Sequence, residues 1–296
     1  MWCLLLLTSL SDYVTDLELV SATGDLERLL SASPSASGAR HRLRDHVLLH
    51  NVLGAALHTP LYPGGTVPQP NAVLDEVRAL NATRVLELGY GKGFNALHLA
   101  QRAPGVRFVA VDDGPSRVAD ASVRAVRRNL TNVEFRSLRL SDMVCPEPFD
   151  VVYSIESLRY TDPAWLLSLA GRCLRPGGAL LLIDAFLADG LAESSGECRT
   201  ALRLVQSGYG TRMMPSVSHW RRASSIHGFR VSRSWDWTSE ALPFWDTGAY
   251  AARKAMYVYS WLPESARAST VASVMAPHAL RGGATMYGGV LMHREL

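Results

Sequence analysis

The chain has 296 residues, of which 48% are hydrophobic and 19% are charged, and its formal net charge is +3. This length fits one large domain or two small ones, and the composition excludes a disordered or fibrous protein. No apolar run reaches the ~20 residues that a membrane-spanning helix needs. The apolar start, Trp2–Leu7, has no basic flank and is shorter than the core of a signal peptide. We expect a packing helix there, with a short membrane-touching anchor as the alternative, and no stable membrane insertion.

The basic residues are almost all arginine, since only Lys92 and Lys254 are lysines among the 30 basic residues. Together with the many alanines, this excess looks like a bias in coding composition. A cluster of arginines is therefore weak evidence for phosphate binding, and the small net charge does not indicate a nucleic-acid partner.

The four cysteines are Cys3, Cys145, Cys173 and Cys198. They lie far apart in the sequence and form no C-x-x-C pair. We therefore expect neither a metal site nor a disulfide framework, and the default location is a reducing compartment, the cytoplasm.

Residues 1–70 are expected to form an N-terminal helical extension. Two helix-like stretches, Tyr13–Leu30 and Arg42–Leu57, flank a Ser/Ala/Gly-rich break at Ser31–Gly38. The passage Thr59–Pro70 holds four prolines, which exclude a regular helix or a central strand. We interpret this passage as a linker or a lid loop.

Strands and helices alternate between Asn71 and Phe186. Apolar spacing of about 3.6 residues predicts helices at 71–80, 94–103, 115–130 and 164–174. Short apolar runs predict strands at 84–89, 106–112, 133–138, 149–155 and 179–186. The helix at 115–130 is expected to bury Val118, Ala121, Ala125 and Val126. Alternation at this spacing requires right-handed βαβ crossovers and a mostly parallel sheet.

The spacing of the apolar residues changes after Phe186. We expect two helices near Cys198–Gln206 and Ser216–Ser225, a strand at 229–238, a late helix at 242–259 and a last, antiparallel strand at 285–293. The fold class is then α/β, a seven-stranded mostly parallel sheet with helices on both faces. The domain at 71–296 is expected to carry a cap insertion at 187–228.

The sharpest signal is the segment VLELGYGKGF, residues 85–94, which joins a buried strand to a helix. Gly89, Gly91 and Gly93 remove side chains from the turn, so backbone N–H groups and a helix N-terminus can approach a ligand closely. A glycine triplet alone is weak evidence, but the strand–turn–helix context strengthens it.

The residues around the glycines decide between ligands. The dinucleotide fingerprint G-x-G-x-x-G requires glycine where Phe94 stands, and the Lys–Ser/Thr pair of a P-loop is absent. Glu87 would lie poorly beside a pyrophosphate, but its carboxylate suits the ammonium of a methionine group. This negative charge favours S-adenosylmethionine over NAD.

Two further acidic residues follow the next strands. Asp112 ends the second strand, 23 residues after Gly89, where a carboxylate can accept both ribose hydroxyls. Its neighbour Asp113 could exchange roles with it. Asp142 follows the third strand and suits the adenine amino group, or is an ordinary turn aspartate.

At these residues the sequence resembles the class I S-adenosylmethionine-dependent methyltransferases, in particular the small-molecule branch that includes sterol, tocopherol and natural-product methyltransferases. The matching motifs are LELGYGKGFN, VAVD, FDVVYSIESLRYTDP and RCLRPGGALLLID. The resemblance implies a Rossmann-like fold, S-adenosylmethionine as cofactor and methyl transfer. Two positions depart from the branch: Tyr90 stands where cysteine is frequent, and Tyr160 where histidine is frequent.

Methyl transfer needs orientation, desolvation and, for some acceptors, removal of a proton. Glu156 and Tyr160 follow the fourth strand, at the sheet edge where open α/β folds bind ligands. Glu156 is either an acceptor contact or a salt-bridged glutamate. His219 in the expected cap is a candidate base, as is His227, although a packing or solvated role is the simpler one for each. The aromatic residues of the cap either enclose an apolar acceptor or form its own core.

Three other classes of protein share features with this sequence. An NAD-dependent oxidoreductase is opposed by Phe94 and Glu87. A nucleic-acid or protein methyltransferase would usually show an N/D-P-P-F/Y motif after the fourth strand, where this chain has SIESLRY. A catalytically silent, cofactor-binding module is the third. We expect a small, partly apolar acceptor and no nucleic-acid partner, and the sequence leaves the oligomeric state open.

Overall fold

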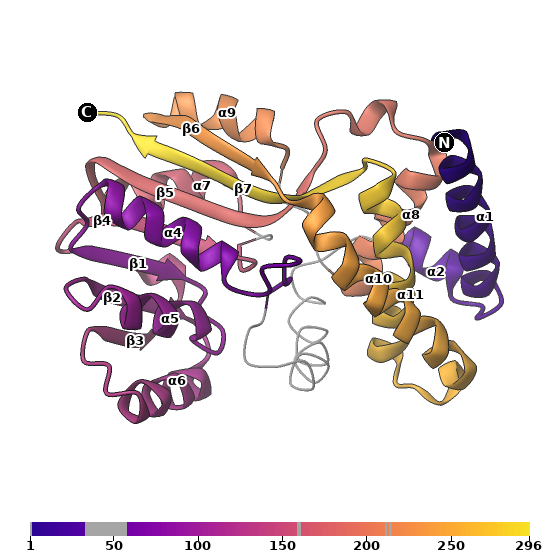
Figure 1. Cartoon of the computed structure of the whole chain (residues 1–296), viewed down its shortest axis with the longest axis horizontal. Coiled ribbons are helices and arrows are strands. Elements are labelled where there is room, and N and C mark those ends of the chain that lie inside the picture. Colours follow the sequence, from indigo (N-terminus) through magenta and orange to yellow (C-terminus); the bar gives the residue numbers. More distant parts are fainter. Residues whose placement is uncertain (1, 33–57, 159–160, 211, 213–214) are drawn as a thin grey trace. The chain divides into compact units, whose positions relative to one another are not determined.

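The computed structural model describes residues 2–32, 58–158, 161–210, 212 and 215–296 (Figure 1). These residues form two compact units. A helical unit draws its described residues from 1–52, 186–213 and 237–287, and a sheet unit draws them from 53–185, 214–236 and 288–296. The expected boundaries were 1–70, 71–296 and a cap at 187–228, whereas here 196–209 packs with the N-terminal helices and 217–226 packs with the sheet.

The sheet unit is built on a seven-stranded sheet with the strand order β3-β2-β1-β4-β5-β7-β6. Neighbouring strands from β3 to β5 pair in parallel, and β6 pairs with β7 antiparallel. This is the mostly parallel α/β sheet expected from the sequence. The strands are β1 (Arg84–Leu88), β2 (Arg107–Asp112), β3 (Val133–Ser137), β4 (Phe149–Ile155), β5 (Leu174–Leu187), β6 (Phe229–Asp236) and β7 (Thr285–Arg294).

Helices cover both faces of this sheet. Right-handed crossovers through α5 (Phe94–Arg102) and α7 (Pro163–Cys173) run in opposite directions from the centre of the sheet, which places the two helices on opposite faces. Helix α4 (Pro68–Ala79) contacts α5, and α9 (Val217–Ile226) contacts α7. Helix α6 (Pro115–Arg127) follows β2. The central strands are buried on both sides, as their runs of Val, Leu and Ile require.

In the described part of the helical unit, five α-helices pack around an apolar cluster of their own. They are α1 (Trp2–Ser21), α2 (Leu26–Ser31), α8 (Gly196–Tyr209), α10 (Thr238–Ala255) and α11 (Glu264–Arg281). Small residues let α8 and α11 approach closely, because a Cβ on Gly208 would lie 2.3 Å from the carbonyl oxygen of Ala268. Tyr209 and Trp245 belong to this cluster, so in these two cap aromatics the packing role is the one observed.

Several local expectations were wrong. The helix expected at 13–30 is two helices, because Gly24 takes a left-handed φ of +74° between them. Pro68 starts α4 instead of excluding it, since the first turn of a helix tolerates proline. Val126 is exposed, and only Ala121 and Ala125 of the expected inward face of α6 are fully buried. The helix expected at 42–57 lies outside the described residues.

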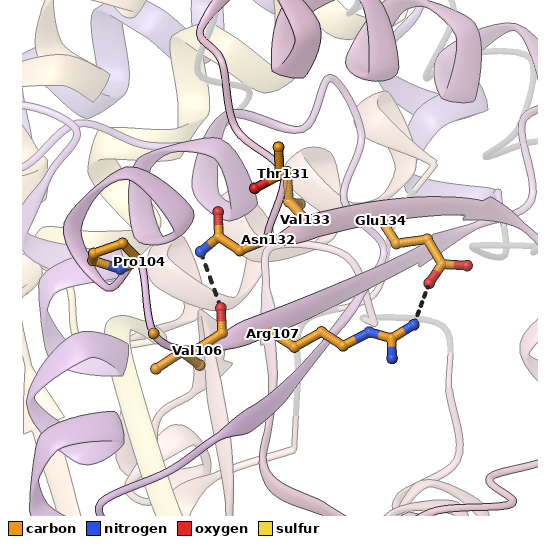
Figure 2. A pocket seen from close by; sticks show the side chains of 8 residues that line it. Pro104, Val106, Arg107, Thr131, Asn132, Val133 and Glu134 are labelled. Carbon is orange, nitrogen blue, oxygen red and sulfur yellow. Dashed lines mark hydrogen bonds and ion pairs between the residues drawn. The ribbon is translucent and has the colours of Figure 1, made fainter.

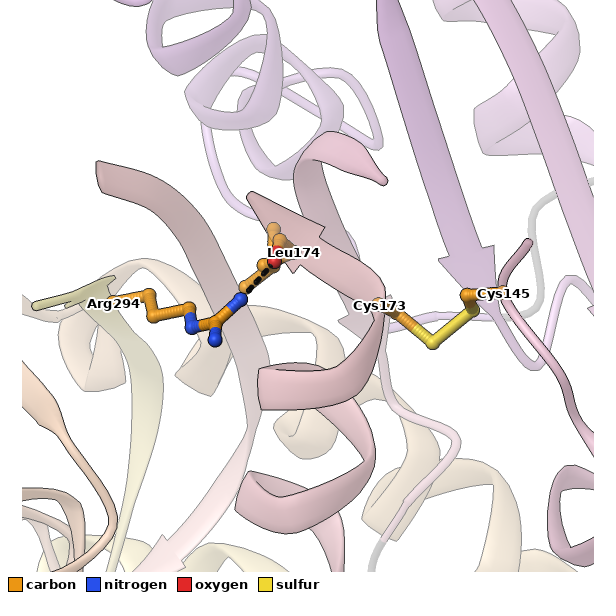
Figure 3. The surroundings of a disulfide bond; sticks show 4 residues. All are labelled: Cys145, Cys173, Leu174 and Arg294. Carbon is orange, nitrogen blue, oxygen red and sulfur yellow. Dashed lines mark hydrogen bonds between the residues drawn. A yellow bond between two sulfur atoms is a disulfide. The ribbon is translucent and has the colours of Figure 1, made fainter. Parts of the chain in front are cut away.

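The structure contains a disulfide between Cys145 and Cys173 (Figure 3). This corrects the expectation that the cysteines are too far apart to pair. Cys145 lies shortly before β4 and Cys173 directly before β5, and these strands are parallel neighbours in which Phe149 pairs with Leu174. Parallel pairing therefore brings the two cysteines together although 28 residues separate them. Cys198 is a free cysteine.

No helix among the described residues is long and apolar enough to cross a membrane. Within the same residues, no group of three or more His, Cys, Asp or Glu side chains is placed to hold a metal ion.

A buried ion network fastens α1 to the other helices of the helical unit. Asp16 is 2% exposed and accepts hydrogen bonds from Nε and Nη2 of Arg253 on α10, at 2.7 and 2.6 Å. His278 of α11 lies 2.7 Å from the same carboxylate, with its ring edge-on to Tyr13. Burial raises the pKa of Asp16, but the hydrogen bonds and charges of Arg253 and His278 outweigh burial and hold the pKa below its ordinary value.

We expect Asp16→Asn to lower the free energy that holds α1 against the other helices by about 3 kcal/mol. This value is at the lower end of the cost of breaking a buried ion pair, because Arg253 can turn to solvent. A lowered pKa stabilises the fold above the ordinary aspartate value of about 3.9 and the benefit disappears as the pH falls below it. Hydrogen exchange of the α1 amides measures both effects. The exposed Asp12→Asn serves as the control, and equal protection in the two variants would contradict this role.

Candidate cofactor-binding site

The carboxyl ends of β1, β2 and β4 meet at one edge of the sheet (Figure 1). The chain leaves β1 toward β2 on one side, while β4 continues the sheet on the other side. The order of strands therefore reverses between β1 and β4, and open α/β sheets bind ligands in the crevice at such a point. All residues discussed below as candidate cofactor ligands come from this edge.

The turn from β1 to α5 is left-handed at all three glycines. Gly89, Gly91 and Gly93 have φ values of +80°, +54° and +78°. Residues other than glycine rarely adopt these backbone conformations. A Cβ on Gly89 would lie 2.4 Å from the Cβ of Ser157, which follows β4, and a Cβ on Gly93 would lie 2.9 Å from the ring of Phe135. Gly93 is the N-cap of α5, so the turn presents the N-terminus of a helix at the sheet edge.

Glu87 is the buried acid of this site. It lies next to last in β1, is 1% exposed, and pairs across the strands with Tyr153 of β4. Its Oε1 accepts a 3.3 Å hydrogen bond from Asn95, and its Oε2 has no hydrogen-bond partner. Burial raises the pKa of Glu87 to about 8, and the nearby polar side chains of Tyr153 and Asn95 only partly offset this rise. A buried carboxylate with an unused oxygen fits a ligand that brings a cationic donor such as an ammonium group.

Asp112 joins the end of β2 to the glycine turn. Its Oδ2 accepts a 2.9 Å hydrogen bond from the N–H of Gly91, and its Oδ1 accepts one from Gly114 and one from Arg117. Asp112 is 8% exposed, whereas the side chain of Asp113 is 59% exposed. Of the two neighbours, Asp112 is therefore the one built into the turn.

The structure assigns less of a role to Asp142. It ends a short 3₁₀ helix, η1 (Leu140–Asp142), after β3, and it is exposed. Its Oδ1 accepts a 2.9 Å hydrogen bond from Ser141. The position after β3 is the one expected from the sequence, but this geometry leaves the ordinary turn aspartate equally open.

Glu156 adopts an unusual backbone conformation directly after β4. Its φ is +50°, a strained value for a residue with a side chain. The N–H of Glu156 donates to Ile183 of β5 at 2.8 Å, and its Oε1 accepts from the N–H of Thr59 at 2.7 Å. The carboxylate therefore holds the segment before α4 against the sheet edge.

The other two catalytic candidates are Tyr160 and His219. Tyr160 lies outside the described residues. His219 is exposed near the start of α9, which packs against β6 and α7, and β6 lies three strands away from β4. Strands are spaced by about 4.8 Å, so the structure does not bring His219 and Glu156 together.

The sequence analysis missed several groups at this edge. His58 is 4% exposed, and its ring centroid lies 5.9 Å from that of Phe94, the first residue of α5. Phe94 in turn stacks on His98. Asp184, 1% exposed, directly follows the residue of β5 that bonds to Glu156. Thr59 contributes a backbone N–H, which no residue type signals, whereas the acidic end of β5 in LLID was visible in the sequence.

A shallow pocket of about 390 Å³ lies elsewhere, at the amino ends of β2 and β3 (Figure 2). It is lined by Pro104–Arg107 and Thr131–Glu134. The Asn132 side chain there donates to three carbonyl groups, including that of Val106 at 3.0 Å. These bonds tie loops together at the edge opposite the glycine turn, so we assign the pocket no ligand.

The comparison with protein families decides what kind of domain this edge belongs to. Residues 85–178, from β1 through the start of β5, match the family model described as a methyltransferase domain. Residues 85–178 are thus similar to class I methyltransferase domains. The cofactor of this class is S-adenosylmethionine, and the buried Glu87, the left-handed glycine turn and Asp112 fit its methionine and ribose groups.

One curated relative is 27-O-demethylrifamycin SV methyltransferase from Amycolatopsis mediterranei, 27% identical over 169 residues. The match covers 56% of this chain and 61% of that relative. The chain thus spans less than two thirds of the length of this relative.

Two solved structures share the methyltransferase fold with this chain. The [4+2]-cyclase SpnF is 18% identical with a TM-score of 0.66, and the match covers 88% of this chain and 95% of that one. Geranyl diphosphate C-methyltransferase from Streptomyces coelicolor, in complex with S-adenosyl-L-homocysteine, is 18% identical with a TM-score of 0.59, over 77% and 80% of the two chains. At this identity the likeness establishes the fold alone.

We expect Asp112→Ala to weaken the binding of S-adenosylhomocysteine by about 1–3 kcal/mol, because charge-assisted hydrogen bonds to the ribose are lost. The exposed neighbour provides a matched control, and Asp113→Ala should bind as the wild type does. Isothermal titration calorimetry measures both. If the loss of affinity appears in Asp113→Ala instead, Asp113 and not Asp112 contacts the ribose.

The raised pKa of Glu87 gives the binding a pH dependence. Below about pH 8 the free protein holds this carboxyl protonated, whereas an ammonium group favours the carboxylate. Affinity for S-adenosylhomocysteine should therefore rise with pH up to about 8, by at most about tenfold per pH unit for one linked proton. Titrations in buffers of different ionisation enthalpy should show proton release that Glu87→Gln removes. A flat profile in the wild type would refute the contact.

Proposed function

We propose that the chain is an S-adenosylmethionine-dependent methyltransferase that acts on a small, partly apolar acceptor. The observation that carries the proposal is the left-handed glycine turn between the buried Glu87 and Asp112, in a domain that matches the methyltransferase family. S-adenosylmethionine supplies a methyl group already activated by a sulfonium.

We assign Glu87 to the ammonium group of the cofactor, Gly89, Gly91 and Gly93 to close approach of its backbone, and Asp112 to its ribose. Asp142 is assigned to the adenine. Glu156 faces the same edge from β4 and is assigned to the acceptor, which it would orient or relieve of a proton. The Thr59–Glu156 hydrogen bond supports this role because it holds the carboxylate in one position.

The apolar character of the acceptor is inferred from the rings near the turn. Phe94, His58 and His98 stand together at the start of α5, and rings of this kind exclude water from the reaction. We propose no nucleic-acid partner, since many arginines are engaged in ion pairs, among them those at 28, 84, 107, 136, 175 and 281.

A cytoplasmic location stays a prediction. The disulfide between Cys145 and Cys173 is a reason to test it, because disulfides are rare in reducing compartments. Non-reducing mass spectrometry of the protein isolated under acid quench would decide whether the two thiols are paired in the cell.

The test is transfer of a labelled methyl group from S-adenosylmethionine to a panel of small phenols, alcohols, amines and carboxylic acids, with RNA, DNA and protein as further acceptors. We expect turnover on a small acceptor, and Glu156→Gln should lower it by about 100-fold or more. Affinity for S-adenosylhomocysteine should stay within about twofold, since the amide retains the size of the carboxylate.

Glu147→Gln provides the control, because Glu147 is 66% exposed in an ion pair with Arg84 at the far end of β1. Turnover on a polymer with a steep salt dependence would overturn the assignment of the acceptor. Tight binding of S-adenosylhomocysteine without transfer to any class of acceptor would favour the catalytically silent module.

A further inference from the structure

The helical unit exposes a row of aromatic side chains where α10 passes into the 3₁₀ helix η3 (Met256–Trp261). The row, here called the aromatic stripe, consists of Tyr250, Lys254, Tyr257, Val258 and Trp261. All five side chains are exposed, while Met256 and Tyr259 of the same segment are buried. Tyr257 is 86% exposed and Trp261 is 89% exposed.

The opposite face of the same segment is buried. Ala249, Ala252, Met256 and Tyr259 contribute to the core of the helical unit. Tyr259 also donates a 2.7 Å hydrogen bond to Asp25, and the Arg267 guanidinium lies 5.8 Å from the centre of its ring. The segment is therefore anchored, and the exposure of the aromatic stripe follows from the fold and not from a frayed helix end.

A stripe of this composition is unusual on a water-facing surface. Single exposed apolar residues are common and need no explanation. Here Tyr257 and Trp261 are 86% and 89% exposed and Val258 is 51% exposed, within six residues of the chain. Tyr and Trp combine an apolar body with a polar tip, which suits the boundary between water and hydrocarbon.

The stripe itself carries one cation. Lys254 lies within it, with its Nζ 5.4 Å from the ring centre of Tyr250. Along the chain, the nearest carboxylates on either side are Asp246 and Glu264. Asp246 is paired with Arg281 at 2.5 Å and Glu264 with Arg28 at 2.7 Å. The stripe therefore presents rings and an ammonium group beside carboxylates that are already neutralised.

We propose that the aromatic stripe docks on the surface of a phospholipid bilayer that contains anionic lipids. The rings of Tyr257 and Trp261 enter the interfacial layer, while the Lys254 ammonium stays at the level of the phosphates. A second copy of the chain fits less well, because a two-fold contact would set Lys254 near its own counterpart. The proposal is independent of the methyl acceptor and concerns residues outside the sheet unit.

The test is co-sedimentation of the full chain with vesicles of phosphatidylcholine alone and of phosphatidylcholine mixed with phosphatidylglycerol. We expect binding to the mixed vesicles that falls about tenfold in Trp261→Ser and further in the double variant with Tyr257→Ser. Lys254→Gln should lose about fivefold on the mixed vesicles and little on pure phosphatidylcholine. The control is Trp165→Ser on α7 of the sheet unit, 37% exposed, which should bind as the wild type does.

All four side chains are exposed, so their variants should retain the far-ultraviolet circular dichroism and the S-adenosylhomocysteine affinity of the wild type. Equal vesicle binding by the wild type and the double variant would overturn the proposal. So would absence of vesicle binding together with a dimer, seen by light scattering, that Trp261→Ser dissociates, since the stripe would then be a contact between copies.

Discussion

The turn from β1 to α5 has room for hydrogen atoms and not for side chains. Gly89 packs closely against Ser157, which follows β4, and Gly93 packs closely against Phe135 of β3. The first contact fixes the ends of the two central strands to each other, and the Ser157 hydroxyl reinforces it by donating to the Gly89 carbonyl at 2.7 Å. The second sets the N-terminus of α5 at the sheet edge. The positions of Glu87, Asp112 and Glu156 all follow from this one turn.

Acidic side chains are buried at the same edge of the sheet. Glu87 and Asp184 are each 1% exposed, and a buried carboxylate costs free energy unless a partner compensates for it. Glu156 adds backbone strain at φ +50°. Burial and strain of this kind concentrate at functional sites. In the helical unit the buried Asp16 is engaged by Arg253 and His278, which is what a structural ion network requires.

Much of the sheet unit could be predicted because its signals are local. A buried strand, a glycine turn and an amphipathic helix lie within twenty residues of one another, and their order sets the sheet. In the helical unit, helices near 198–206 and 242–259 were expected, but no local signal shows that they pack together, since the helices come from three separate stretches of the chain. Helix α11 was not predicted, because Pro277 lies inside it and many of its buried positions are alanine, which weakens the apolar periodicity.

The residues of the candidate site also differ in whether the sequence predicts them. Glu87, the glycines and Asp112 could be read from their place at strand ends. The hydrogen bond from Thr59 to Glu156 could not, because it uses a backbone N–H that is 97 residues distant. The Cys145–Cys173 disulfide was missed for a related reason, as parallel pairing of β4 and β5 makes the two residues neighbours. His219 was named for its residue type, and the fold carries it to α9.

The central claim is that the left-handed turn holds the adenosyl and methionine groups of the cofactor against Glu87 and Asp112. Calorimetric titration of the full chain with S-adenosylhomocysteine and with NAD tests it most directly, with Gly91→Val as the comparison. The account requires that S-adenosylhomocysteine binds, that NAD does not, and that the valine abolishes binding while circular dichroism shows the fold intact. Binding of NAD, or unchanged affinity for S-adenosylhomocysteine in Gly91→Val, would contradict it.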